Sequence, residues 1–147
     1  MTTDHPTHVG HVHLKVRDIE RALAFYIEVL ALEVTERHGR YAFCSWGEQH
    51  HDVALQGIGE DAPGPGPGVG MYHAAFEVET PETLRTVYER LREHDVLVSP
   101  VDHGISKALY FDDPDGNGLE VYLDTRETQE QSNWQGRNEP FDPTGLS

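Results

Sequence analysis

The side chains most able to do chemistry in this sequence are its histidines, of which there are ten. Histidine is the commonest metal ligand in proteins and the usual acid or base near neutral pH. His11, His73 and Glu120 fall on strand-like segments, at positions that alternate with the apolar side chains. Two imidazoles and one carboxylate are the ligand set of non-haem Fe(II) oxygenases, which leaves positions open on the metal. The sequence therefore predicts a metal site at these three residues.

An internal repeat relates the segments that carry the two histidines. Residues 11–18 alternate apolar and polar side chains, which predicts a strand, and Asp18 then suits a helix N-cap. Residues 73–80 have the same pattern, and Pro81 follows at the position that proline favours in a first helical turn. The helices are expected to continue from Ile19 and from Pro81 with apolar residues at helical spacing. One constant offset over both segments indicates a duplicated unit.

Three strand-like runs follow each predicted helix, so each half is expected to be strand–helix–three strands. The runs lie near residues 32–36, 40–45, 52–56, 96–100, 107–111 and 119–123. This pattern predicts an α+β fold of two repeated βαβββ modules. The expected organisation is an N-terminal extension at 1–8, one domain at 9–124 and a C-terminal tail at 125–147. Within the domain, module one covers about 9–58, a Pro-Gly linker covers 59–70, and module two covers 71–124.

Composition and charge narrow the classes of partner. The net charge is −15, which disfavours nucleic acid and anionic membrane surfaces. No apolar run approaches the roughly 20 residues that span a bilayer, and residues 1–10 lack the apolar core of a signal peptide. The single cysteine, Cys44, suits a reducing compartment. We therefore expect a cytoplasmic enzyme or binding protein for small molecules.

Three motifs resemble the vicinal oxygen chelate superfamily, which includes glyoxalase I, fosfomycin-resistance thiol transferases and extradiol ring-cleaving dioxygenases. They are His-x-x-Leu-x-Val-x-Asp from His11, His-x-x-Phe-x-Val from His73, and the run from Tyr110 to Tyr122 that contains Asp-Pro-Asp-Gly-Asn-Gly-Leu-Glu-Val. The resemblance covers about residues 9–124. It implies a half-open barrel around a metal, with His11, His73 and Glu120 as ligands.

Three further residues resemble the extradiol dioxygenases in particular. His51 precedes Asp52 as the catalytic acid–base does in that family, and His103 stands in a His-Gly-Ile-Ser segment whose histidine binds the substrate. Tyr110 matches the family's substrate-binding tyrosine. The resemblance thus implies an Fe(II) enzyme, with Mn(II) also possible, that cleaves a catechol with O₂. It further implies a single-domain version of the family, which we expect to be a homodimer.

Two assignments near these residues stay open. Strand alternation would turn His50 toward the same face as Asp52, whereas the motif selects His51, so His50 is the alternative acid–base. His13 is either a neighbour of the metal ligands or a half-exposed strand residue. The tail is either a flexible end or an arm laid over the domain or a partner.

Three alternative functions share the predicted fold. A glyoxalase-like isomerase usually needs a fourth ligand, but the repeat offset from Glu120 leads to Ile58, which cannot bind a metal. A fosfomycin-type thiol transferase usually has threonine two residues after the first histidine, where this chain has His13. The third alternative is a non-catalytic module that binds a small molecule.

Overall fold

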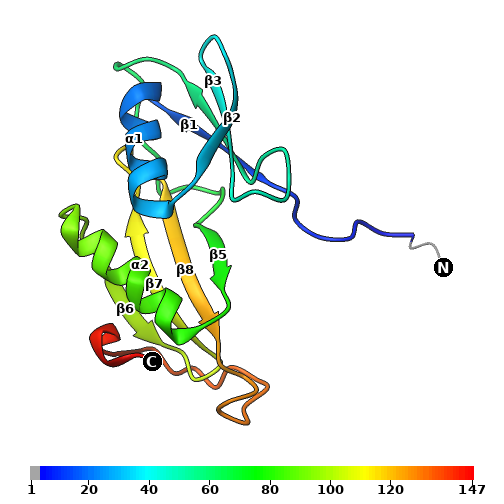
Figure 1. Cartoon of the computed structure of the whole chain (residues 1–147), viewed down its shortest axis with the longest axis vertical. Coiled ribbons are helices and arrows are strands. Elements are labelled where there is room, and N and C mark those ends of the chain that lie inside the picture. The colour runs from blue at the N-terminus through cyan, green and yellow to red at the C-terminus, as the bar shows by residue number, and fades with distance from the viewer. Residues whose placement is uncertain (1–3) are drawn as a thin grey trace. The chain divides into compact units, whose positions relative to one another are not determined.

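The computed structural model describes residues 4–147, which form two compact units that divide between Gly64 and Pro65 (Figure 1). The first unit contains β1 (Val12–Val16), α1 (Ile19–Leu30), β2 (Glu33–His38), β3 (Tyr41–Ser45) and β4 (Val53–Gly57). The second contains β5 (Ala74–Val78), α2 (Pro81–Glu93), β6 (Ser99–Asp102), β7 (Ser106–Asp112), β8 (Gly118–Asp124), β9 (Glu139–Pro140) and the 3-10 helix η1 (Pro143–Gly145).

The two units have the same sheet topology. The strand order is β1-β4-β3-β2 in the first sheet and β5-β8-β7-β6-β9 in the second. In both, the first strand pairs in parallel with the last strand of its module, and the other pairs are antiparallel. The predicted α+β fold with two βαβββ modules is therefore confirmed, and each sheet is open at both edges.

Both helices begin where the repeat predicts. The Asp18 carboxylate accepts hydrogen bonds from the backbone N–H groups of Glu20 and Arg21, at 2.9 and 3.4 Å. The Thr80 hydroxyl accepts one from the N–H of Thr83 at 3.1 Å, and Pro81 is the first residue of α2. Such caps satisfy N–H groups that have no partner within the helix. Within residues 4–147, neither helix is long and apolar enough to cross a membrane.

The apolar core of each unit lies between its helix and one face of its sheet. On β1, Leu14 and Val16 are buried while His13 is exposed. On β8, the alternate positions Leu119, Val121 and Leu123 are buried with the apolar face of α2. The opposite faces of the sheets therefore carry the polar side chains that the alternation assigns to them.

One strand lies later in the chain than the apolar pattern predicts. Residues 96–100 resemble a strand, but β6 begins at Ser99. The preceding residues end α2 instead: Asp95 has a left-handed backbone with φ of 56°, and the N–H of Val96 donates to the carbonyl of Leu91 at 2.9 Å. This reversal satisfies carbonyl groups at the end of the helix, so Val96 is not available to the sheet.

The C-terminal segment, residues 125–147, lies along the second unit. Its short strand β9 pairs with β6, and Pro143 of η1 is buried. The guanidinium of Arg85 on α2 donates to the carbonyl of Leu146 at 2.7 Å. The segment is thus an arm that packs on its own module.

Candidate functional site

The predicted metal ligands of the second unit, His73 and Glu120, are in direct contact. His73 directly precedes β5, and Glu120 lies on the neighbouring strand β8. The distance from His73 Nε2 to Glu120 Oε1 is 2.9 Å. Glu120 is only 8% exposed, and this burial raises the pKa of its carboxyl, although the nearby His73 acts in the opposite direction. A buried carboxylate beside an imidazole is a costly arrangement that a cation would stabilise.

Two predicted substrate-binding residues adjoin this pair. Tyr110 on β7 lies opposite Glu120 in the strand register, and its ring centre is 5.6 Å from that of His73. His103, in the loop between β6 and β7, has Nε2 2.7 Å from the Tyr110 hydroxyl oxygen. Burial, followed by the Glu120 charge, raises the pKa of Tyr110 to about 12. The phenol therefore keeps its proton at neutral pH and can act as a hydrogen-bond donor.

The other two predicted residues, His11 and His51, meet in the first unit. Their ring centres are 4.3 Å apart. The contact follows from the backbone, because the N–H of Val12 donates to the carbonyl of Asp52 at 3.1 Å and joins the starts of β1 and β4. Burial, and next the neighbouring His11 and His50, lowers the pKa of His51. His51 is therefore a neutral imidazole at pH 7, as a proton acceptor must be.

His50 and His51, the two candidates for the acid–base, have different surroundings in the structure. His50 directs Nε2 to Glu36 on β2, with 3.0 Å between Nε2 and Oε1. Its Nδ1 is 2.9 Å from Nδ1 of His51. Strict alternation does not apply to His51, because β4 begins only at Val53. His13, on β1, has Nε2 3.2 Å from the amide oxygen of Gln56.

His73 and Glu120 are suitable donors for a metal ion, although the described residues do not form a complete set of ligands. Across residues 4–147, no group of three His, Cys, Asp or Glu side chains is arranged to hold a metal ion. His73 and Glu120 nevertheless offer an imidazole nitrogen and a carboxylate oxygen on one face of one sheet. These are donors that Fe(II) and Mn(II) accept. The residues of the second unit thus fit two positions of the predicted ligand set.

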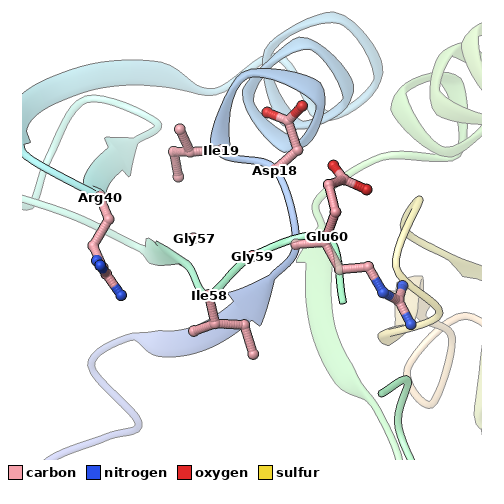
Figure 2. A pocket seen from close by; sticks show the side chains of 8 residues that line it. Asp18, Ile19, Arg40, Gly57, Ile58, Gly59 and Glu60 are labelled. Carbon is pink, nitrogen blue, oxygen red and sulfur yellow. The ribbon is translucent and has the colours of Figure 1, made fainter. Parts of the chain in front are cut away.

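A cavity of about 390 Å³ lies elsewhere in the first unit, between the start of α1 and the end of β4 (Figure 2). Arg17, Asp18, Ile19, Arg40 and residues 57–60 line it. His11 and His51 precede β1 and β4, whereas this cavity follows the same two parallel strands. Five residues of strand span roughly 16 Å, so the cavity and the histidine pair are at opposite ends of the strands.

The sequence reasoning missed the partners of His103 in the C-terminal segment. His103 Nδ1 is 2.7 Å from the side-chain oxygen of Asn138 and 3.2 Å from the carbonyl oxygen of Arg137. The polar sequence around these residues has no periodicity that would predict contact with a residue more than 30 positions earlier. The short strand β9 beside them brings the contact about.

Comparisons with known proteins agree with the duplicated fold. The profile of the Glyoxalase/Bleomycin resistance protein/Dioxygenase superfamily matches residues 8–121. A catechol-2,3-dioxygenase of Bacillus subtilis (strain 168) is 34% identical over 137 residues, which are 92% of this chain and 47% of that protein. Biphenyl-2,3-diol 1,2-dioxygenase 2 of Rhodococcus globerulus is 34% identical over 126 residues, which are 84% of this chain and 66% of that protein. The chain thus spans about half to two thirds of the length of these relatives.

A solved structure gives the same result for the fold. The crystal structure of a glyoxylase/bleomycin resistance protein/dioxygenase domain from Frankia sp. EAN1pec has a TM-score of 0.69 to this chain. The match covers 82% of this chain and 99% of that one, at 24% sequence identity. At this identity the likeness concerns the fold alone.

Proposed function

We propose that this chain, which belongs to the Glyoxalase/Bleomycin resistance protein/Dioxygenase superfamily, is a metal-dependent extradiol dioxygenase. Its substrate would be a catechol-type diol that is cleaved with O₂ beside the two hydroxyl groups. The observation that carries the proposal is the contact of 2.7 Å between His103 Nε2 and the Tyr110 hydroxyl, on the strand next to Glu120. The names of the two dioxygenase relatives support the same reaction class.

The proposed metal ligands are His73 and Glu120 of the second unit together with His11 of the first. Their donor set suits Fe(II), with Mn(II) as the second choice. A bound divalent metal would supply the positive charge that favours loss of a phenol proton from the diol. His73 Nε2 and Glu120 Oε1 lie 2.9 Å apart, so the two donor atoms are close enough to bind one ion.

His51 is the proposed proton carrier. Its Nδ1 is engaged with His50 at 2.9 Å, so Nε2 is the ring nitrogen that can hold a substrate proton. The lowered pKa of His51 keeps the ring neutral at pH 7, which allows it to accept the second phenol proton and to return it later. Its ring lies 4.3 Å from that of His11, so the proton would be held beside a proposed metal ligand.

Tyr110 and His103 are the proposed substrate-binding residues. Tyr110 retains its proton because its pKa is raised to about 12, so its hydroxyl can donate to Nε2 of His103 while its oxygen accepts a hydrogen bond from a diol hydroxyl. His103 fixes that hydroxyl from the other side through Nε2. The isomerase alternative has no comparable support, because Ile58 stands where its fourth ligand is needed.

The proposal is tested by loading the protein with Fe(II) without oxygen, adding catechol or 2,3-dihydroxybiphenyl in air, and measuring the absorbance of the yellow ring-opened product. We expect product from the wild-type protein and none from His73→Ala or Glu120→Ala, which also lose bound iron. His38→Ala, a change at an exposed histidine at the end of β2, is the matched control and retains both activity and iron. Full iron content with no product from either diol would contradict the proposal and favour the transferase or isomerase reactions.

The proposal includes a cytoplasmic homodimer. The single cysteine suits a reducing interior, and small members of the resembled family often pair. Light scattering of the purified protein measures the oligomer, and a monomer at micromolar concentration would remove that part of the proposal without affecting the reaction.

A further inference from the structure

The ring of His103 is held on both sides by groups of the second unit. Nδ1 faces two oxygen atoms of the C-terminal segment, the side-chain oxygen of Asn138 at 2.7 Å and the carbonyl oxygen of Arg137 at 3.2 Å. Nε2 faces the hydroxyl of Tyr110 at 2.7 Å. The backbone carbonyl of Arg137 can only accept a hydrogen bond, so the hydrogen of a neutral His103 ring lies on Nδ1.

We propose that the C-terminal segment orients His103 in the candidate site, and that Asn138 is the positioning residue. Asn138 accepts the shorter of the two hydrogen bonds from Nδ1 and, together with the Arg137 carbonyl, favours the tautomer whose Nε2 lone pair faces the Tyr110 hydroxyl. The consequence for turnover rests on the proposed function, in which Tyr110 and His103 bind the diol. The positioning itself is a property of the protein without metal or substrate.

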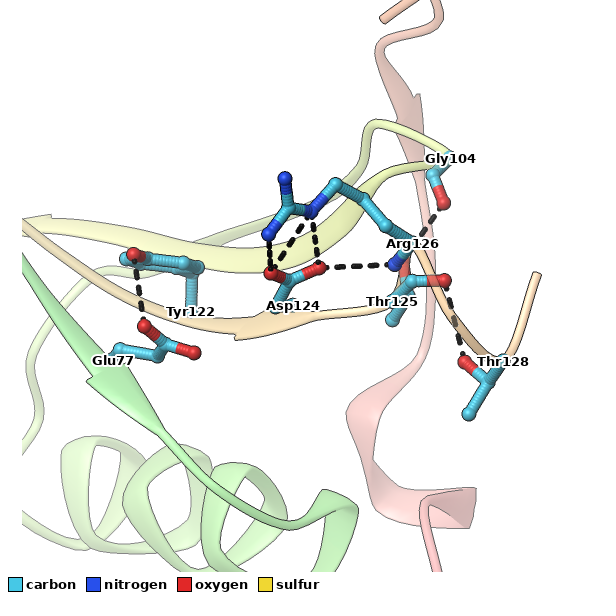
Figure 3. A network of polar contacts seen from close by, with 7 residues as sticks. All are labelled: Glu77, Gly104, Tyr122, Asp124, Thr125, Arg126 and Thr128. Atoms are coloured by element: carbon cyan, nitrogen blue, oxygen red, sulfur yellow. Dashed lines mark hydrogen bonds and ion pairs between the residues drawn. The ribbon is translucent and has the colours of Figure 1, made fainter. Parts of the chain in front are cut away.

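The loop that carries His103 is anchored to the start of the same segment (Figure 3). The Thr125 hydroxyl donates to the carbonyl of Gly104 at 2.7 Å, and both residues are buried. The N–H of Thr125 also donates to the carbonyl of Ile105 at 2.9 Å. The two residues after His103 are therefore bound to the first residue of the C-terminal segment.

The middle of the segment packs against the same loop. Gly104 has a left-handed backbone with φ of 81°, and a Cβ atom there would lie 2.8 Å from the side-chain oxygen of Gln131. Only glycine combines this backbone with so close a neighbour. The loop and the segment thus have complementary shapes at Gly104.

Strand pairing holds the part of the C-terminal segment that lies next to Asn138. In β9, Glu139 pairs with Asp102, the residue before His103. The Arg137 guanidinium lies 3.4 Å from the Asp102 carboxylate and 2.9 Å from that of Glu139. Asn138 therefore stands between two residues tied to the end of β6, which limits its motion relative to His103.

The tautomer is tested by long-range proton–nitrogen correlation spectra of the metal-free, full-length protein. In a neutral imidazole ring, the protonated and unprotonated nitrogens have distinct shifts, so the spectra are recorded at pH 8. The His103 signals are identified by their loss in His103→Gln. We expect the hydrogen on Nδ1 in the wild-type protein. A hydrogen on Nε2, or shifts averaged between the two forms, would overturn the proposal.

Three variants test whether Asn138 maintains this state. Asn138→Ala removes the shorter acceptor and leaves only the Arg137 carbonyl at 3.2 Å, so we expect His103 shifts that move part of the way toward the average of the two tautomers. Asn138→Asp keeps an acceptor oxygen and should retain the wild-type shifts, and Asn133→Ala is the control at an exposed asparagine of the same segment. Wild-type shifts in Asn138→Ala would refute the positioning role.

Turnover gives a second readout of the same variants. With Fe(II) and catechol, Asn138→Ala should lower kcat about fivefold to tenfold at unchanged iron content, the effect of losing one ordinary hydrogen bond. Asn138→Asp should restore most of the rate, and equal rates in all three variants would contradict the role in turnover. Absence of ring cleavage in the wild-type protein would refute the proposed function alone, because the spectra require neither metal nor diol.

Discussion

Tyr110 of β7 lies directly opposite Glu120 of β8, so a phenol and a carboxylate share one face of the second sheet. Directly opposed residues of antiparallel strands have Cβ atoms roughly 5 Å apart. The Glu120 charge contributes to the raised pKa of Tyr110, after burial. A ligand held by Glu120 would therefore lie within reach of a protonated phenol.

The hydroxyl of Tyr110 is expected to contribute to turnover and not to metal binding. Tyr110→Phe keeps the ring and removes the hydrogen bond to His103, so kcat/KM for catechol should fall about tenfold at unchanged iron content. Tyr122→Phe is the matched control, because that hydroxyl donates to Glu77 at 3.3 Å and not to His103. Equal losses in the two variants would contradict a specific role for Tyr110.

His51 and His50 should differ in their effect on the rate. Removal of a general acid–base costs about 10²-fold to 10⁴-fold, so His51→Gln should lower kcat by at least about 10²-fold and leave the iron content unchanged. His50→Gln should lower kcat by less than about tenfold, because Nε2 of His50 faces Glu36 and only its Nδ1 contacts His51, the proposed proton carrier. A larger loss in His50→Gln would assign the acid–base to that residue.

Gly118 is expected to be essential for the position of His73. A Cβ atom at Gly118 would lie 2.6 Å from the backbone oxygen of Tyr72 and 3.5 Å from Cβ of His73. Gly118→Ala should therefore displace the start of β5, lower the free energy of unfolding by about 1–3 kcal/mol, and weaken iron binding. The measurements are urea unfolding and iron titration.

Gly68→Ala provides the control for that substitution, since a Cβ atom at Gly68 meets nothing within 4 Å. Its stability and iron affinity should match the wild-type protein. If Gly118→Ala also behaved as wild type, close approach of β8 to His73 would have no part in the metal site.

The buried thiol of Cys44 predicts a loss of stability in alkaline solution. Cys44 is 0% exposed, and burial raises the pKa of its thiol in the folded state. Because the folded pKa exceeds the unfolded value of about 8.5, its contribution to stability is complete below that pH and is lost as the pH rises through the folded pKa. Urea midpoints between pH 8 and 10.5 should fall more steeply for the wild-type protein than for Cys44→Ala. Parallel curves would show that the thiol does not contribute.

The sequence predicts the local features of the fold well, because each depends on residues close together in the chain. The caps at Asp18 and Thr80 follow from a side-chain acceptor placed just before an apolar helical stripe. The contact of His73 with Glu120 follows from two features. Alternation places both side chains on the same face, and β5 pairs with β8 as β1 pairs with β4 in the first module. Because the same pattern of strand, cap and helix occurs in both modules, a chance match is less probable than it would be for one module.

Features that depend on chain reversals or distant contacts could not be predicted in this way. His51 lies in the loop before β4, where side chains need not alternate between the two faces of the sheet. Only the family motif selects His51 over His50. Val96 resembles a strand residue, but its N–H ends a helix. The contact of His103 with Asn138 joins residues with no shared periodicity, because two residues of β9 suffice to bring them together.

Pairing of β9 with β6 has a further consequence for the behaviour of the protein at high concentration. Without β9, the outermost strand of the second sheet would present unpaired N–H and C=O groups that another molecule can extend. The C-terminal segment covers this edge at Val101 and Asp102, and Pro140 in β9 offers no N–H to a further strand. The segment that holds His103 through Arg137 and Asn138 therefore also protects the chain against intermolecular β-sheet aggregation through the next two residues.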